Sequence, residues 1–426
     1  MTIVLALTVG GSCAPIVTAI RDYEPDHVCF LASTGPRGSR MVVDGPGRPC
    51  DEGRSPSIVN QLGLDPQRYQ VVELSDPDAL ADLYAVCRAA LRDLRSRFPD
   101  ARCIADYTGG SKSMGAALAM AAVSAGWELS LVKGQRTDLV QVAQGTEISA
   151  LINVWEVRAR QRMEEALQLF NDFAYAPAIE LLAVLQRTAP LSSELQRTAR
   201  GWIAYARGFD AWDRFDHARA ARILDTVPGE GIDWRFLKTL TGQIRGCGYE
   251  PVLDLFLNAD RRAARGRFDD AVARLYRALE LLAQTRMRQR EPPLDSSDMD
   301  VAVLPDEIRP RYERMRQIAE IEGLGPKVKL GLMEDYALLE SLGDPLGRVF
   351  AGLEGPLRDA IQKRNKSILA HGLEPLTRGD YQAMRAVAET LFGAGLRALG
   401  EQVHASQFPL LGPDGLHPRE RSRCSC

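Results

Sequence analysis

Long hydrophobic runs are missing from this sequence. No apolar run reaches the roughly 20 residues that span a bilayer, so a membrane protein is not expected. The first residues, MTIVLALTVGG, carry no basic side chain and are broken by glycine, which argues against a secretory signal peptide. The net charge is −3, so the chain also lacks the global positive field that attracts nucleic acid. Any nucleic-acid site would have to be a local patch.

Cysteine pairs with the spacing of a zinc site are missing as well. None of the eight cysteines forms two spaced pairs of the kind that bind zinc, and Cys424 with Cys426 is a single C-x-C. Cys29 and Cys103 lie in apolar runs that are typical of strands, so they are predicted to be buried. This use of cysteine predicts reduced thiols, a cytoplasmic protein and no bound metal.

Strand and helix patterns alternate over the first third of the chain. Strands are predicted at 3–9, 27–33, 70–74, 103–107, 128–133 and 138–143. One helix is predicted from Pro15, a second over 78–97, and an alanine-rich third helix after Ser113. The alternation predicts an α/β domain over residues 1–152, with a Rossmann-like sheet of parallel strands.

The pattern changes to helices at about residue 155. An aromatic residue followed three positions later by alanine recurs at uneven intervals, which favours helix hairpins over a regular repeat. Residues 291–305 are rich in proline and acidic residues and predict a linker. We therefore expect a helical linker or insertion over 153–260, an all-α bundle over 261–405, and a flexible tail over 406–426.

Two glycine-rich turns follow two of the predicted strands. They are Gly10, Gly11 and Ser12, and the run of Thr108, Gly109, Gly110, Ser111, Lys112 and Ser113. In a parallel sheet both turns lie at the carboxyl edge, where backbone N–H groups, hydroxyls and Lys112 suit a phosphate-bearing or nucleotide ligand. Neither turn has the spacing of a P-loop or of a G-x-G-x-x-G fingerprint. The plainer alternative is a pair of tight turns that cap helices.

The two turns and the segments around them resemble a known family. TVGGS at 8–12 and DYTGGSKSMGAALAMAA at 106–122 are similar to the CARF domains of type III CRISPR accessory proteins. The resemblance covers the predicted α/β domain. It implies that this domain dimerises and binds cyclic oligoadenylate across the two-fold axis. Matched residue by residue, the ligand loops would be Gly10 to Ser12 and Thr108 to Ser113.

A second motif, RNKSILAH, contains Arg364, Asn365 and one of only five histidines, His371. The surrounding segment predicts a helix that ends at Gly372. On such a helix Arg364 and His371 would be two turns apart on one face. A guanidinium holds phosphate oxygens and an imidazole transfers protons near neutral pH, so the pair suits RNA cleavage without a metal. A solvated arginine and a histidine near a helix cap are the plainer alternative.

This motif resembles the R-x4–6-H signature of HEPN ribonucleases, in which asparagine often follows the arginine. RLYRALELLAQ at 274–284 looks like the first long helix of that fold. CARF followed by HEPN is the architecture of RNases that cyclic oligoadenylate activates in type III CRISPR antiviral defence. The resemblance implies that Arg364, Asn365 and His371 are catalytic. It also implies a metal-independent endoribonuclease that cuts single-stranded RNA as a homodimer, with cyclic oligoadenylate as allosteric activator and no cofactor.

Three other functions stay open at this point. The first is a CARF sensor or adaptor dimer without nuclease activity, which requires the His371 face to be buried or unpaired across the two-fold axis. The second is a ring nuclease that degrades cyclic oligoadenylate at Lys112 and the neighbouring hydroxyls. The third, a nucleotide-dependent oxidoreductase, has the least support, because no acidic residue stands at the required distance after a fingerprint.

Overall fold

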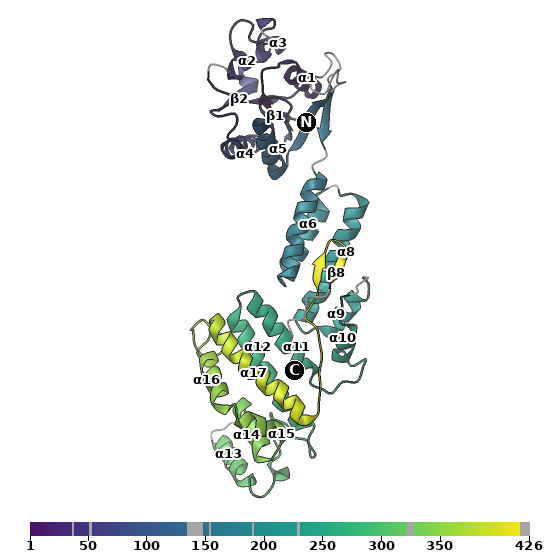
Figure 1. Ribbon diagram of the computed structural model, residues 1–426, viewed down its shortest axis with the longest axis vertical. Helices are drawn as coiled ribbons and strands as arrows, with labels where there is room; N and C mark the ends of the chain where they lie inside the picture. The colour runs from purple at the N-terminus through teal and green to yellow at the C-terminus, as the bar shows by residue number, and fades with distance from the viewer. Residues whose placement is uncertain are drawn as a thin grey trace. The chain divides into compact units, whose positions relative to one another are not determined.

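The computed structural model describes residues 1–35, 38–50, 53–133, 148–152, 155–189, 191–227, 231–321 and 328–417. The chain divides into two compact units. The first comprises residues 1–161 with 189–192, and the second comprises residues 162–188 with 193–426. Figure 1 labels most of the helices and some of the strands of the two units. No helix within the described ranges is both long and apolar enough to cross a membrane.

A six-stranded sheet forms the centre of the first unit. In spatial order its strands are β3 (Tyr69–Leu74), β2 (His27–Ser33), β1 (Ile3–Val9), β4 (Arg102–Asp106), β5 (Glu128–Lys133) and β6 (Ile148–Ile152). The first five are parallel, and β6 pairs antiparallel with β5. The predicted α/β fold is therefore confirmed, with five strands placed to within one residue. The antiparallel edge strand was not predicted, and the strand predicted at 138–143 lies outside the described residues.

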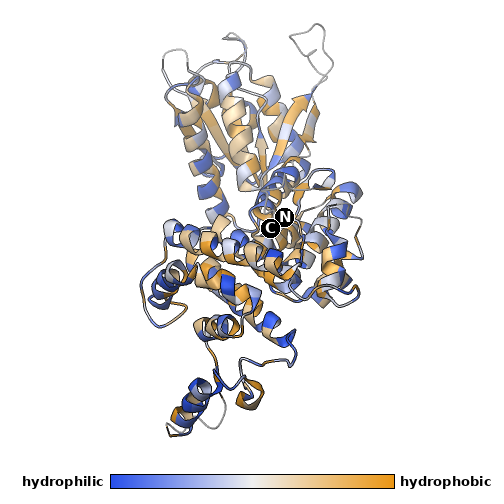
Figure 2. Cartoon of the chain, turned by 60° about the horizontal axis from the view of Figure 1, so that its bottom comes forward, coloured by the Kyte–Doolittle hydropathy of each residue, from blue (hydrophilic) through white to orange (hydrophobic). Residues whose placement is uncertain are grey.

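Helices cover both faces of this sheet. They are α4 (Leu80–Arg97) and α5 (Lys112–Ala125) on one face, and α1 (Ala14–Tyr23), α2 (Arg40–Asp44) and α3 (Ile58–Leu62) on the other. Successive side chains of β1 point to opposite faces, so Val4 packs with the first pair of helices and Leu5 with the other three. Burial on both faces explains why the strands are continuous apolar runs. Figure 2 shows these strands as mainly hydrophobic between helices of mixed hydropathy.

The cysteines of this unit agree with the prediction except at one pair. Cys29 and Cys103 are buried free thiols, as predicted. Cys13 and Cys50 instead form a disulfide, so the expectation of reduced thiols is wrong for this pair. The two residues are 37 positions apart in the sequence, and the sheet topology brings them together. Cysteine spacing along the chain carries no signal for such a pair.

Helices make up most of the second unit. They are α6 (Trp155–Asn171, which starts in the first unit), α7 (Tyr175–Thr188), α8 (Ser193–Asp213), α9 (His217–Leu224), α10 (Trp234–Leu240), α11 (Glu250–Ala264), α12 (Phe268–Arg288), α13 (Arg309–Ile321), α14 (Leu332–Ser341), α15 (Pro345–Ala351), α16 (Glu354–Asn365) and α17 (Arg378–Leu399). Sequence neighbours pack together, as in α7 with α8 and α11 with α12. This confirms the predicted helix hairpins. Helix α12 contains the predicted long helix at 274–284.

The segment after α17 is ordered, so the prediction of a flexible tail from residue 406 is wrong over residues 408–417. Strands β7 (Leu410–Gly412) and β8 (Gly415–His417) form a small hairpin. The side-chain amide of Asn171 donates to the Leu411 carbonyl at 2.9 Å, and the Leu411 N–H donates to Asn171 Oδ1 at 2.7 Å. These long-range contacts have no local sequence signature, which is why composition alone suggested a tail.

Phe408 fills the core between helices α7 and α8. Its side chain is 3 % exposed, and its ring centroid lies 4.9 Å from that of Phe209 and 5.0 Å from that of Trp212. The ring of Tyr175, on α7, lies 6.3 Å away. The aromatic core of these helices is therefore completed by a residue that lies far from them in the sequence.

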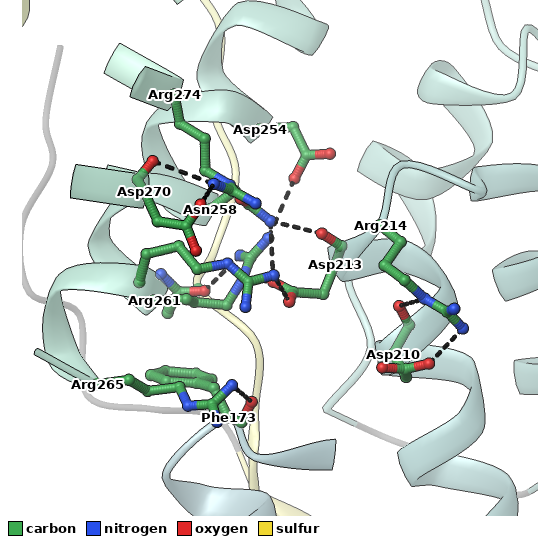
Figure 3. A network of polar contacts seen from close by, with 12 residues as sticks. Phe173, Asp210, Asp213, Arg214, Asp254, Asn258, Arg261, Arg265, Asp270 and Arg274 are labelled. Carbon is green, nitrogen blue, oxygen red and sulfur yellow. Dashed lines mark hydrogen bonds and ion pairs between the residues drawn. The ribbon is translucent and has the colours of Figure 1, made fainter. Parts of the chain in front are cut away.

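A buried ionic network around Arg261 holds Gln407 and Phe408 in place (Figure 3). Arg261 is 1 % exposed and donates from Nε to Asp213 Oδ1 at 2.7 Å and from Nη1 to Gln407 Oε1 at 2.8 Å. Its guanidinium lies 3.7 Å from the ring centroid of Phe408. Asn258 donates to Asp213 Oδ1 at 2.8 Å. Because these charges are buried, removal of the Asp213 carboxylate would leave the Arg261 guanidinium without its nearest charged partner, and breaking a buried ion pair in this way typically costs about 3–5 kcal/mol.

Candidate functional site

The two glycine-rich turns meet at the carboxyl edge of the sheet, because β1 and β4 are neighbours. The Thr8 hydroxyl donates to the Gly109 carbonyl at 2.6 Å. A Cβ atom on Gly10 would lie 2.7 Å from the Gly110 nitrogen, and one on Gly109 would lie 2.3 Å from the Thr8 carbonyl oxygen. Such separations are too short for any side chain. The glycines therefore allow the two backbones to touch, as the sequence pattern predicts for this edge.

The predicted hydroxyls divide into two sets. Ser111 caps α5, because its Oγ accepts the Met114 N–H at 3.1 Å and donates to the Pro77 carbonyl. Thr108 Oγ1 accepts the Val132 N–H at 2.8 Å. Ser12 is exposed and Ser113 is half-buried. Thr108 and Ser111 thus hold the loop in shape, which supports the capping interpretation for those two residues.

A pocket of about 340 Å³ opens beside the second turn. It is lined by Tyr107, Thr108, Gly109, Gly110, Ser111, Lys112, Gly115, Ala116 and Ala119. Lys112 is exposed and forms no ion pair within the described part of the chain. The N-terminus of α5 adds a partial positive charge. The pocket therefore suits an anionic or oxygen-rich ligand. Gly10, Gly11, Ser12 and Ser113 do not line it.

Asp106 supports this loop through its carboxylate, a role that was not predicted from the sequence. Its carboxylate is fully buried, accepts the Thr108 N–H at 3.0 Å and accepts the Ser130 hydroxyl at 2.6 Å. Burial raises the pKa of Asp106. Tyr23 extends the chain of contacts by donating to Ser130 at 3.0 Å. The sequence signal that could have identified Asp106 was an acidic residue at the end of an apolar strand.

The segment of the second motif folds differently from the prediction. Helix α16 ends at Asn365, not at Gly372, so Arg364 and His371 do not share a helical face. The chain reverses instead: the His371 N–H donates to the Asn365 carbonyl at 3.2 Å, and the Gly372 N–H donates to the Ser367 carbonyl at 3.2 Å. A Cβ on Gly372 would lie 2.0 Å from the Lys366 carbonyl oxygen. The glycine allows this tight reversal.

Apolar residues within the turn explain the wrong helix prediction. Ile368 and Leu369 extend the apolar spacing of α16, but their exposed fractions are 66 % and 47 %. Leu373 is 85 % exposed. A pattern that normally marks a buried helical face here marks an exposed apolar surface beside the motif. The predicted convergence of Arg364 and His371 now depends on the reversed turn, not on helical periodicity.

Arg364 lies against an aromatic ring. Its guanidinium carbon is 4.4 Å from the ring centroid of Tyr276, on α12. Nη1 donates to Asn365 Oδ1 at 3.2 Å, while Nε is buried and has no acceptor in the described part of the chain. The side chains of Asn365 and His371 are exposed. Arg364 and Asn365 thus end helix α16, and His371 follows in the reversed turn.

Arg277 and Glu280 lie one turn apart on the same helix as Tyr276. Their side chains are 3.4 Å apart, and Arg277 also donates to Gln284 at 3.0 Å. Arg277 is 48 % exposed, which makes this a surface pair rather than a direct brace for Arg364. Burial raises the pKa of Tyr276, with a further contribution from the Glu280 carboxylate.

Asp335 is a buried acid in the same bundle. It is 1 % exposed, and its carboxylate accepts the Ser296 hydroxyl at 2.7 Å. Burial raises its pKa from 3.8 to about 7, with a smaller contribution from Glu280 and Glu334. Between these two values the folded protein holds a proton that the unfolded chain has lost.

The free energy of unfolding is therefore expected to fall as the pH rises from about 4 to about 7, and to level off above that. Asp335→Asn should flatten this slope, because the amide does not titrate. Urea denaturation at a series of pH values measures it. The exposed Asp359→Asn is the control and should keep the wild-type slope. An unchanged slope in Asp335→Asn would show that another group is responsible.

Within the described residues, no group of three or more His, Cys, Asp and Glu side chains is arranged to hold a metal ion.

Comparison with known proteins agrees with this two-part architecture. Residues 247–393, which contain the motif, match the family model described as the Csm6 HEPN domain. The structure is similar to Csm6 from Enterococcus italicus, which was solved bound to cyclic hexa-2'-fluoro-hexa-dAMP. The TM-score is 0.59 at 12 % identity, over 95 % of this chain and 96 % of that one. No curated protein matches the sequence.

Two further solved structures match only part of the chain. One is a type III CRISPR defence DNA nuclease activated by cyclic oligoadenylate, at 14 % identity and a TM-score of 0.25, over 49 % of this chain and 34 % of that one. The other is Can2 from Sulfobacillus thermosulfidooxidans in complex with cyclic tetra-adenylate, at 14 % identity and a TM-score of 0.24, over 52 % and 68 % of the two chains. Scores this low have no weight for the whole fold.

The Csm6 match covers 95 % of this chain, so it includes helices after residue 155 as well as the sheet. The predicted fold class, an α/β domain followed by an all-α region with a HEPN bundle, is confirmed. Residues 247–393 therefore match a HEPN domain of the Csm6 type, and the chain as a whole shares the fold of the Csm6 structure.

Proposed function

We propose that the protein is a metal-independent endoribonuclease for single-stranded RNA, switched on by cyclic oligoadenylate in type III CRISPR antiviral defence. One observation carries the proposal. In the residues that match the Csm6 HEPN model, Arg364 and Asn365 end helix α16, and the reversed turn that follows bonds the His371 N–H to the Asn365 carbonyl. Two of the three side chains are exposed, and Arg364 has no carboxylate partner in the described part of the chain. A cation kept free of carboxylates suits an anionic substrate.

The proposed reaction uses the RNA's own hydroxyl. The 2′-oxygen attacks the adjacent phosphorus, and the bond from phosphorus to the 5′-oxygen breaks. The products are a 2′,3′-cyclic phosphate and a free 5′-hydroxyl, so the proton lost by the 2′-OH is balanced by the one gained at the leaving oxygen. His371 moves one of these protons. Arg364 stabilises the charge that develops on the phosphate oxygens, and Asn365 orients Arg364.

Cyclic oligoadenylate is proposed as the activator because of the pocket beside the second glycine turn. Backbone N–H groups, the N-terminus of α5 and Lys112 favour its phosphates and riboses. We propose that Gly10, Gly11, Ser12 and Ser113 join this site when a second protomer completes it. The decisive experiment incubates the purified protein with labelled RNA, with and without cyclic tetra- or hexa-adenylate. Cleavage that depends on one ring supports the proposal, and binding without any cleavage would favour an adaptor instead.

The exposure of His371 bears on the adaptor alternative, which requires that side chain to be buried or unpaired across the axis. It is exposed here. For a ring nuclease, Thr108 and Ser111 are poor candidates, because both hydroxyls already hold the loop together. A time course of the ring itself, followed by mass spectrometry, separates activation from degradation.

Replacement of Lys112 by alanine is expected to weaken the binding of the ring by about 1–3 kcal/mol, because a charged donor to phosphate or ribose is lost from a covered site. Isothermal titration calorimetry with cyclic tetra- and hexa-adenylate measures it. Arg92→Ala removes an exposed cation from α4 and serves as the control. Equal affinity in the two variants would remove Lys112 from the site but leave the proposed ligand in place.

A homodimer is proposed because each chain supplies one half-site. The exposed apolar side chains of Ile368, Leu369 and Leu373 beside the motif support a HEPN interface there. Light scattering should give twice the 46.9 kDa of one chain. Leu373→Asp should lower this mass and reduce cleavage together, whereas Ile321→Asp, at 84 % exposure on α13, should do neither. A fully active monomer would contradict the proposal.

A further inference from the structure

The ring of Tyr276 contacts the flat face of the Arg364 guanidinium. The ring belongs to α12 and the guanidinium to the last turn of α16, two helices that pack together. The guanidinium carbon lies 4.4 Å from the ring centroid, a distance typical of a cation–π contact. Tyr276 is half-buried, so its position is set by the bundle. The residue stands 88 positions before Arg364 in the sequence, outside any short motif.

Several other arginines of this unit pair with carboxylates. Arg286 donates to Asp344 at 2.8 Å, and Arg385 donates to Asp260 at 2.9 Å. Arg364 forms no ion pair in the part of the chain that the structure describes. Its side chain donates to the neutral amide oxygen of Asn365, at 3.2 Å. The structure thus fixes this guanidinium with uncharged groups.

The kind of support matters for the chemistry. A carboxylate would occupy the N–H edge of the guanidinium and compete with phosphate. An aromatic ring contacts the flat face, where the guanidinium has no donors, and leaves the donors in the plane for other acceptors. In the described residues Arg364 Nε is buried without an acceptor, so no carboxylate occupies that part of the guanidinium edge. Ring support therefore orients the arginine without consuming its charge.

We infer that Tyr276 is a positioning residue for RNA cleavage, whose ring sets the plane of the Arg364 guanidinium toward the scissile phosphate. This inference rests on the proposed function, in which Arg364 stabilises the charge on that phosphate. The hydroxyl of Tyr276 has no part in it. The contribution appears in the chemical step and not in the binding of RNA.

The test compares variants that keep or remove the ring. Tyr276→Phe should keep kcat within about twofold, because the ring stays. Tyr276→Leu and Tyr276→Met should lower kcat by about 10–100-fold, the effect of a catalytic group displaced by about an ångström, with KM nearly unchanged. Making both ring-free variants keeps the test valid if one of them fails to fold, as judged from its melting temperature. Phe268→Leu is the matched control, since Phe268 is also half-buried on α12 beneath an arginine, with Arg378 at 5.9 Å.

A double-mutant cycle decides whether Tyr276 acts through Arg364. In an Arg364→Ala background, Tyr276→Leu should cause no further loss of kcat. Full additivity, or a loss in Tyr276→Phe equal to that in Tyr276→Leu, would overturn the inference while leaving the proposed function intact. Unchanged cleavage in Arg364→Ala itself would instead overturn the proposed function, so the two failures are distinguishable.

Discussion

His371→Ala is expected to lower the rate of RNA cleavage by about 10²–10⁴-fold, the usual contribution of a positioned proton-transfer group. The side chain is exposed and its backbone is tied to Asn365, so the substitution removes an imidazole without opening a core. Single-turnover cleavage of labelled RNA at saturating ring concentration measures it. His404→Ala is the control, because His404 is also exposed in the same unit but lies outside the turn. Full activity in His371→Ala would refute the assignment.

Arg364→Ala should lose a comparable amount, because it removes the charge that stabilises the developing phosphate negative charge. Activity of the wild type should survive EDTA, and its products should carry a 2′,3′-cyclic phosphate. Neither substitution should change the affinity for the ring. A mass spectrum with a linear 3′-hydroxyl product would contradict the mechanism, since the RNA's own 2′-oxygen would not then be the nucleophile.

Phe408→Ala is expected to destabilise the second unit by about 3–5 kcal/mol, the usual cost of removing a buried phenylalanine. Its ring contacts Phe209 and Trp212, and it covers the guanidinium of Arg261. The loss therefore combines a cavity with an exposed ionic network. Urea denaturation followed by tryptophan fluorescence measures it, with Trp212 as a nearby reporter.

Phe215→Ala is the matched control for this experiment. Phe215 is half-buried in the turn before α9, and its ring contacts only the edge of His217 among the ring pairs of the described residues. Its loss should be well under half as large. Equal unfolding midpoints for the two variants would show that the segment around Phe408 is not part of the cooperative core.

Much of the sheet could be predicted because the burial of its strands is visible in the local sequence. A parallel strand covered on both faces is a continuous apolar run, as in β1 and β2, and a glycine pair at its end marks the turn. Strand β6 gave no such signal, since it is an edge strand with half-exposed residues. The two glycine loops were correctly placed side by side, because the rule for parallel sheets fixes which ends of the strands meet.

The candidate catalytic turn was harder to predict. Its residues are local, but its shape depends on hydrogen bonds such as His371 N–H to the Asn365 carbonyl, which side-chain periodicity does not report. Ile368 and Leu369 added a false helical signal, because apolar side chains at an exposed surface follow the same spacing as those in a core. Tyr276 could not be found from the sequence either, since only the packing of α12 against α16 brings it to Arg364.

The return of residues 407–411 to the helices around α7 has a consequence for synthesis of the chain. Asn171 and Leu411 are 240 residues apart, so the contacts between them form only after residue 411 has left the ribosome. Domains usually fold in order of their synthesis. Here the aromatic core around Tyr175 and Phe209 waits for Phe408, while the sheet of the first unit and helices α11 and α12 are already available. A ribosome that stops short of residue 408 would release a chain with its sheet and its proposed nuclease helices present, but with an unfilled aromatic core between them in the sequence.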